Sequence, residues 1–150
     1  MDVDSLDLLA RELGFALKPE QKEALESLFR GNDVFCVLPT GFGKSLIYQM
    51  FVYAKSSSSV QRPTIIVISP LKSIMDEQIA SNEFGLSACE LRFDCETLTA
   101  IRDGDVQVVY AAAEQVLNEK FTALLKQGDT TFRCSLSLIV VDESHTVYTW

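Results

Sequence analysis

A glycine-rich segment near the start of the chain follows a short apolar run. Residues 34–38 are apolar and predict a buried β-strand, and residues 38–45 read Leu-Pro-Thr-Gly-Phe-Gly-Lys-Ser. A strand that turns through glycines into a helix directs several backbone N–H groups at one point, where they can hold a phosphate. Gly41 and Gly43 permit backbone angles that are closed to other residues and leave room for a ligand.

The end of this segment supplies the expected phosphate and metal chemistry. Lys44 would place a positive charge against the outer phosphates, and the Ser45 hydroxyl would be a ligand for Mg²⁺. The usual pattern begins with Gly, whereas Leu38 stands there in this chain, so a chance glycine-rich turn is the alternative. The segment alone favours binding of a nucleoside triphosphate.

A second predicted strand ends in an acidic pair. The apolar residues 138–141 run into Asp-Glu-Ser-His, which begins at Asp142. The carboxyl end of a parallel strand is where α/β folds place ligand chemistry. Asp142 could hold Mg²⁺, directly or through water, and Glu143 could polarise an attacking water. A solvated turn is the alternative, but two such motifs in this order, each after a strand, favour a nucleotide-hydrolysing protein.

The composition narrows the class of protein. The chain has 150 residues, 47% hydrophobic and 23% charged, which is ordinary for one globular domain. Its net charge of −8 argues against broad attraction to nucleic acid, but it permits a narrow groove that grips phosphates through backbone amides and a few Lys or Ser side chains.

The sequence contains neither an apolar run of roughly 18 residues nor a basic-then-apolar leader. The four cysteines form no C-x-x-C pair, and Cys36 falls in a predicted core strand. We therefore expect reduced structural thiols, no zinc site and no membrane partner, in an intracellular protein.

Hydrophobic periodicity predicts alternating strands and helices. Ser56–Ser59 are expected to form a flexible connector. The expected helices cover residues 4–13, 19–30, 44–54, 71–83, 94–102 and 112–127, and the expected strands cover 34–38, 64–68, 86–91, 105–110 and 136–141. This alternation predicts an α/β fold with a mostly parallel sheet, whose strands are apolar throughout because helices cover both faces.

With these segments placed, the chain resembles the superfamily 2 helicases and, among them, the RecQ-like DNA helicases, over about residues 9–150. Residues 38–49 look like motif I of that family, which accepts a non-Gly first residue, and residues 69–78 are similar to motif Ia. Residues 110–117 resemble its Y-x-x-P-E-x-L segment, with Ala113 in place of Pro. Asp-Glu-Ser-His stands where the family has D-E-A-H, and Trp150 matches its aromatic-rich loop.

The resemblance implies a RecA-like P-loop NTPase fold that binds ATP and Mg²⁺. Lys18 and Gln21 match motif 0, which reads adenine, although Leu17 replaces the family aromatic and the spacer is one residue short. Without the resemblance, Gln21 would be taken as an exposed helix residue. The expected ATP-site residues are Lys18, Gln21, Pro39, Thr40, Gly41, Phe42, Gly43, Lys44, Ser45 and Asp142, with Ser45 and Asp142 at the metal and with Lys44 and Glu143 in catalysis.

The same resemblance assigns contacts with single-stranded or duplex DNA. Ser69 and Lys72 would touch the backbone, and Tyr148 and Trp150 would stack on bases or sense DNA. His145 would couple the nucleotide state to other domains. The alternatives are a helix N-cap with a solvated lysine for the first pair, and ordinary surface aromatics for the second.

The expected organisation is a pair of N-terminal helices with motif 0 at 1–30, and a partial first RecA-like domain at 31–150 that is incomplete at its C-terminus. The second RecA-like domain, with its arginine finger, and the motif III strand would be absent, so we expect the fragment alone to be inactive. The implied function is ATP-dependent DNA unwinding with 3′–5′ polarity, in the nucleus of a eukaryote or otherwise in the cytoplasm. Another nucleic-acid-stimulated ATPase, such as an RNA helicase or translocase, and a non-catalytic remnant are the alternatives.

Overall fold

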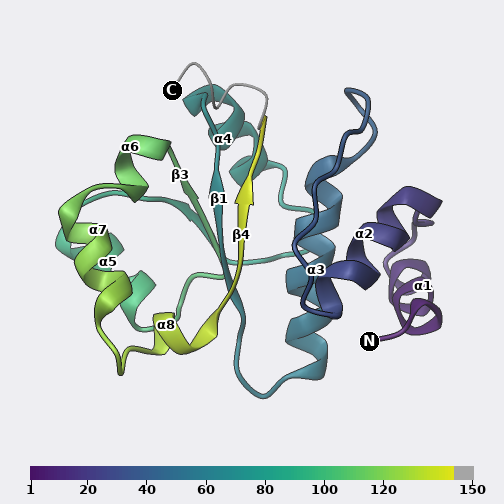
Figure 1. Cartoon of the computed structure of the whole chain (residues 1–150), viewed down its shortest axis with the longest axis horizontal. Coiled ribbons are helices and arrows are strands. Elements are labelled where there is room, and N and C mark those ends of the chain that lie inside the picture. Colours follow the sequence, from purple (N-terminus) through teal and green to yellow (C-terminus); the bar gives the residue numbers. More distant parts are fainter. Residues whose placement is uncertain (144–150) are drawn as a thin grey trace. The chain divides into compact units, whose positions relative to one another are not determined.

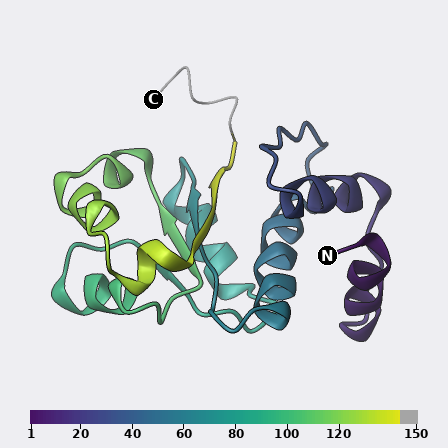
Figure 2. The ribbon, with the colours of Figure 1, turned by 60° about the horizontal axis from the view of Figure 1, so that its bottom comes forward.

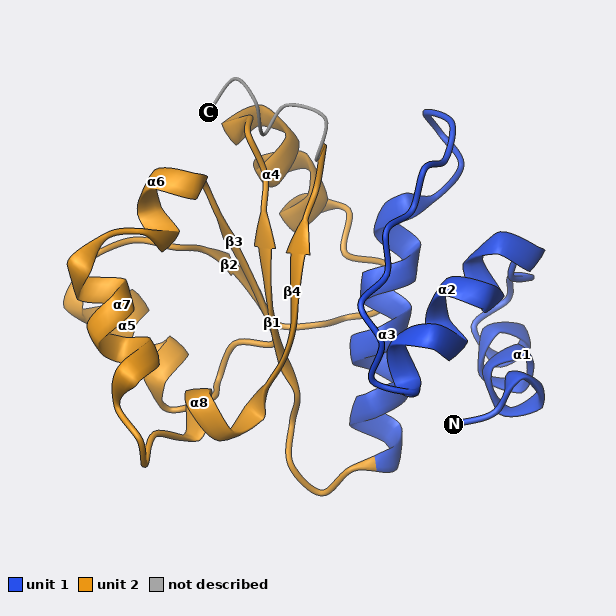
Figure 3. Ribbon diagram, viewed as in Figure 1, with its two compact units in different colours: residues 1–58 blue, residues 59–150 orange. Residues whose placement is uncertain are grey.

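The structure, a computed structural model, describes residues 1–143. The chain divides into unit 1, residues 1–58, and unit 2, residues 59–150, which are coloured blue and orange in Figure 3. The expected boundary between residues 30 and 31 stays a prediction.

Unit 1 contains three helices, α1 (Val3–Glu12), α2 (Pro19–Phe29) and α3 (Lys44–Ser58). Leu6 of α1 and Leu25 of α2 are fully buried, as their helical spacing predicts. Helix α3 is longer than expected and runs to Ser58, and the hydroxyls of Ser56, Ser57 and Ser58 each donate to the carbonyl four residues earlier. The predicted flexible connector at Ser56–Ser59 is therefore wrong for its first three residues, which form the last turn of a helix.

The predicted strand at residues 34–38 is also wrong, since this segment has no helix or strand assignment. Phe35 and Val37 are 79% and 80% exposed, and Cys36 is exposed as well, so none of them belongs to a core strand. A strand is stable only when a neighbour satisfies its backbone groups. Among the described residues, no strand pairs with this segment, and an apolar sequence alone does not supply one.

Unit 2 alternates strands and helices, as predicted (Figure 1). Its elements are β1 (Thr64–Ile68), α4 (Lys72–Ala80), β2 (Ala88–Glu90), α5 (Cys95–Arg102), β3 (Val108–Ala111), α6 (Ala113–Val116), α7 (Glu119–Lys126), α8 (Thr131–Ser135) and β4 (Leu136–Val141). The helical segments expected at about 112–127 are α6 and α7. Helix α6 ends at Val116 with Leu117 as its C-cap, and Asn118 caps α7 by accepting from the Lys120 N–H at 2.9 Å. Helix α8, which has five residues, was not predicted from the sequence.

The four strands form one parallel sheet in the order β2-β3-β1-β4. In the central strand, Ile66 is in register with Val109 of β3 and with Ile139 of β4. Figure 2 shows α5, α7 and α8 gathered on one side of this sheet. The α/β fold with a parallel sheet flanked by helices is thus confirmed, and the carboxyl ends of all four strands lie at one edge.

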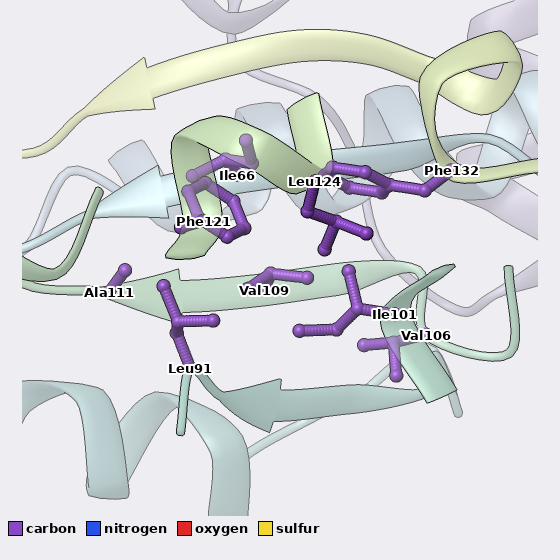
Figure 4. Close-up of a cluster of buried hydrophobic side chains, with 9 residues drawn as sticks. All are labelled: Ile66, Leu91, Ile101, Val106, Val109, Ala111, Phe121, Leu124 and Phe132. Atoms are coloured by element: carbon purple, nitrogen blue, oxygen red, sulfur yellow. The ribbon is translucent and has the colours of Figure 1, made fainter. Parts of the chain in front are cut away.

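The core of unit 2 lies between the sheet and these three helices (Figure 4). Phe121 of α7 and Phe132 of α8 are fully buried, with ring centroids 6.0 Å apart. The cluster consists of Ile66, Leu91, Ile101, Val106, Val109, Ala111, Phe121, Leu124 and Phe132. Strand β4 was expected to be buried on both faces. It is not, since Ile139 and Val141 remain substantially exposed at the edge of the described sheet.

The cluster predicts a large cost for truncating Phe121. Phe121→Ala should lower the free energy of unfolding by about 3–5 kcal/mol, because it removes a buried ring and leaves a cavity among close-packed neighbours. Leu117→Ala is the matched control, since Leu117 is 79% exposed and should change stability by less than about 0.5 kcal/mol. Urea unfolding followed by circular dichroism measures both variants, and equal midpoints would contradict the assignment of Phe121 to the core.

Candidate functional site

The glycine-rich loop of unit 1 has the backbone geometry that its sequence predicts. Gly41 and Gly43 have φ angles of +78° and +90°, in the left-handed region that favours glycine. Between them, the Phe42 N–H donates to the Pro39 carbonyl at 3.2 Å, which closes a turn. Helix α3 begins directly afterwards at Lys44. The first N–H groups of a helix have no partner within that helix and carry its positive dipole end, so this turn leads into a suitable place for a phosphate.

The segment from Lys18 to Gln21 contacts this loop, although more than twenty residues separate the two in the sequence. The Gln21 side-chain Nε2 donates to the carbonyls of Phe42 and Gly43, at 3.2 Å each. The Lys18 Nζ donates to the Phe42 carbonyl at 3.1 Å and lies 4.1 Å from the centre of the Phe42 ring. The segment expected to form motif 0 therefore lies against the phosphate loop.

Gln21 is 3% exposed, so the exposed-helix alternative is excluded by the structure. Its Oε1 accepts the backbone N–H of Lys18 at 2.9 Å, at the start of α2, while its Nε2 holds the loop. A buried amide that is bonded at both ends fixes the loop relative to α2. Adenine recognition by Lys18 and Gln21 stays a prediction.

A side chain on one of the two loop glycines would meet the Gln21 amide. A Cβ atom added to Gly43 would lie 2.7 Å from the Gln21 Nε2, whereas a Cβ added to Gly41 would meet nothing within 4 Å. A side chain at Gly43 would therefore displace the Gln21 amide from the loop, in addition to straining the backbone. A bare backbone turn at the start of a helix is the cradle that a phosphate chain requires, so the residues present fit the expected nucleotide.

The acidic pair of unit 2 follows β4 at the carboxyl edge of the sheet. The Asp142 N–H donates to the Ile68 carbonyl at 2.9 Å, so the end of β1 holds the first acid in place. The Asp142 Oδ1 accepts the Glu143 N–H at 3.0 Å. Glu143 has φ +53°, a left-handed conformation that is uncommon for a residue other than glycine and is found disproportionately at functional sites.

Ser69 and Lys72 follow β1 at the same edge. The Ser69 N–H donates to the Ala111 carbonyl at 3.0 Å, and its buried hydroxyl has no partner among the described residues. Ser69 does not cap α4, whose N-cap is Leu71. A direct contact between Ser69 and a nucleic acid would require the loop to open, and the contacts assigned to Ser69 and Lys72 stay predictions.

Three further side chains lie at this edge and were not expected from the sequence: Glu90, Arg92 and Gln115. The Lys72 Nζ and the Arg92 Nη2 each lie 3.9 Å from the same Glu90 Oε2, although they follow different strands. Gln115 of α6 accepts from the Ala112 N–H at 2.8 Å and donates to the Leu91 carbonyl at 2.9 Å. The available signal was positional, since Arg92 directly follows a predicted strand.

A pocket of about 410 Å³ lies beside these charges. Ile79 and Ala80 of α4 and Cys89 of β2 line it, and Asp76, Glu90 and Arg92 contribute charged groups. Burial disfavours the Cys89 thiolate and raises the pKa of the thiol to about 11, so this thiol is protonated at neutral pH.

For some residues expected at the nucleotide, metal or DNA site, the structure gives no common position. Ser144, His145, Tyr148 and Trp150 lie outside the described residues. Ser45 and Asp142, both expected at Mg²⁺, belong to different units. Within residues 1–143, no cluster of three His, Cys, Asp or Glu side chains could hold a metal, and none of the helices there has the length and hydrophobicity to cross a membrane.

The contact between Gly43 and Gln21 predicts a difference between the two loop glycines. Gly41→Ala should cost about 1–2 kcal/mol of stability, the strain of a left-handed alanine. Gly43→Ala should cost about 1–3 kcal/mol more, because the new methyl group meets the Gln21 amide. In a Gln21→Ala background this extra cost should disappear. Urea unfolding of the double-mutant cycle measures it, and purely additive effects would contradict the steric account.

Comparison with known proteins places the chain in a family. A family model described as DEAD/DEAH box helicase matches residues 18–150. The chain is 32% identical to "ATP-dependent DNA helicase Q-like 5" of Arabidopsis thaliana, over 87% of the chain and 14% of that protein. It is 28% identical to "ATP-dependent DNA helicase RecQ" of Bacillus subtilis, over 95% of the chain and 24% of that protein.

A mimivirus protein named for ATP-dependent RNA helicase activity is 30% identical, over 87% of the chain and 23% of that protein. The chain spans between a tenth and a quarter of the length of the curated relatives that it matches. The family model covers most of the chain and includes the segment from Lys18, the glycine-rich loop and the acidic pair. The chain belongs to the DEAD/DEAH box helicase family.

Proposed function

We propose that the chain is the ATP-binding and DNA-binding part of a RecQ-type, ATP-dependent DNA helicase with 3′–5′ polarity. The contact of Lys18 and Gln21 with the Phe42 and Gly43 carbonyls carries the proposal. It joins the segment that would read the base to the loop that would hold the phosphates.

Bound ATP supplies a phosphoanhydride bond whose hydrolysis provides free energy for strand separation. The chain's own residues would bind and orient it. The backbone from Pro39 to Gly43 would surround the phosphates, Lys44 would neutralise their outer charge, and Ser45 and Asp142 would hold Mg²⁺. Lys18 and Gln21 would lie toward the base.

Glu143 would orient the attacking water and accept its proton. Its left-handed backbone and the tie of Asp142 to Ile68 support this role, since both fix where the acidic side chains begin. A general base needs a defined position more than a large pKa shift, because proton transfer requires hydrogen-bond reach of the water.

The choice of DNA over RNA follows the relatives rather than the geometry. Relatives named as DNA helicases include plant, nematode and bacterial proteins, and a mimivirus relative is named for RNA. Stimulation of ATP hydrolysis by single-stranded DNA but not by RNA, measured on the protein that carries this chain, supports the DNA assignment. Stimulation by RNA alone would instead favour the RNA-helicase alternative.

Lys44→Ala should weaken MgATP binding by at least about tenfold, because the loop loses its only lysine charge toward the outer phosphates. Calorimetric titration with MgATP measures this loss. Lys120→Ala is the control, since Lys120 is an exposed lysine of α7. Equal affinities for the Lys44 variant and the parent would contradict the assigned site.

Glu143→Gln should retain MgATP affinity and lower the turnover of ATP by a factor on the order of 10² or more, because an amide cannot accept the proton of the water. Steady-state ATPase measurements on the protein that carries this chain test this, with a Glu119→Gln substitution of the exposed first residue of α7 as the control. Turnover near that of the parent would refute the role of Glu143.

A further inference from the structure

We propose that Lys18 and Gln21 act on the phosphates of the nucleotide rather than on its base, by fixing the direction of two peptide groups in the glycine-rich loop. The site then selects a nucleotide by its triphosphate, with little preference among bases. This inference rests on the proposed function, since it concerns the same loop, and it changes the role that motif 0 implies for these two side chains.

The Gln21 side chain is fully engaged by the protein. Its amide nitrogen carries two N–H groups, and the carbonyls of Phe42 and Gly43 both lie 3.2 Å from that nitrogen. Its oxygen accepts the Lys18 N–H at 2.9 Å, and the residue is 3% exposed. An amide that reads adenine must donate to the edge of the base and accept from it. Gln21 would have to release a loop carbonyl to do so.

The Lys18 side chain is held by two groups of one residue. Its Nζ donates to the Phe42 carbonyl at 3.1 Å and lies 4.1 Å from the centre of the Phe42 ring. The negative face of an aromatic ring attracts an ammonium group, so the ring and the carbonyl hold Lys18 together. The preceding residue, Leu17, is aliphatic and 6% exposed, and it offers no aromatic face to a base. The groups that motif 0 assigns to the base therefore contact the loop instead.

These contacts decide which way the loop N–H groups point. The described peptide bonds are all trans, and in a trans peptide the C=O and the following N–H point in opposite directions. Donors on the carbonyls of Phe42 and Gly43 thus direct the N–H groups of Gly43 and Lys44 to the other side of the loop. Neither N–H makes a hydrogen bond to another described residue. Both remain available for phosphate oxygens.

A fixed direction matters here because the loop is built on glycine. Gly41 and Gly43 have φ angles of +78° and +90°, and peptide groups beside glycine change direction at little steric cost. A charged donor forms a stronger hydrogen bond to a carbonyl than a neutral donor does, and it polarises the peptide so that its N–H also donates more strongly. The charge of Lys18 thus acts on the phosphates through the peptide group between Phe42 and Gly43.

Two substitutions separate this role from recognition of the base. Gln21→Glu keeps an oxygen for the Lys18 N–H, but the carboxylate cannot donate to the two loop carbonyls. Lys18→Met keeps an unbranched side chain of similar size and removes the charge. Each should weaken binding of Mg²⁺-tripolyphosphate, which has no base, by about tenfold, the loss expected for a buried or charge-assisted hydrogen bond. MgATP and MgGTP should lose the same factor. Arg30→Ala is the matched control, since Arg30 is a 72% exposed cation at the other end of α2.

Calorimetric titration of the protein that carries this chain measures these affinities, with circular dichroism to confirm folding of each variant. The parent should bind MgATP and MgGTP with affinities within about threefold of each other, and it should bind Mg²⁺-tripolyphosphate as well.

Three results would overturn the inference and leave the proposed function standing. The first is a parent that prefers MgATP to MgGTP by more than about tenfold. The second is a parent that binds MgATP but no tripolyphosphate. The third is a pair of variants that lose affinity for MgATP and keep that for tripolyphosphate. A parent that fails to bind MgATP would instead contradict the proposed nucleotide site.

Discussion

Parallel pairing of β1, β2, β3 and β4 is the constraint on which the rest of unit 2 depends. Parallel strands share one direction, so every loop that leaves a carboxyl end emerges at the same edge. The pairing also continues past the strands. The N–H groups of Leu91, Ser69 and Asp142 donate to neighbouring strands at 2.7, 3.0 and 2.9 Å. The acidic pair and the Lys72–Glu90–Arg92 trio therefore start from fixed points, on loops whose first residues are held by the sheet.

In unit 1 a single buried amide has a comparable role. Gln21 bonds the start of α2 with its oxygen and two carbonyls of the glycine-rich loop with its nitrogen. A side chain at Gly43 would displace this amide from the loop. A loop built from two left-handed glycines is otherwise flexible, and a flexible cradle loses binding free energy to the cost of ordering it. Holding the loop in advance lowers that cost.

The sequence predicted the elements that depend on local patterns. Strands β1 and β4 begin and end where their apolar runs do, and the angles of Gly41 and Gly43 follow from the glycine-rich pattern. Features that depend on contact with a residue far away in the sequence were either not predicted or predicted wrongly. The run at 34–38 has strand propensity but no described neighbour, and the shared anion of Lys72 and Arg92 exists only once β1 and β2 lie in one sheet. Burial of Gln21 likewise follows from the position of a loop more than twenty residues away.

The most direct test of the account is hydrogen exchange of the backbone amides with and without MgATP, followed by mass spectrometry. If the glycine-rich loop is a phosphate cradle held by Gln21, MgATP should slow exchange in the loop and the first turn of α3, and also at the start of α2 around Lys18 and Gln21. Exchange in α7, which contains none of the expected ATP-site residues, should not change. Unchanged exchange in both the loop and the start of α2 at saturating MgATP would contradict the account.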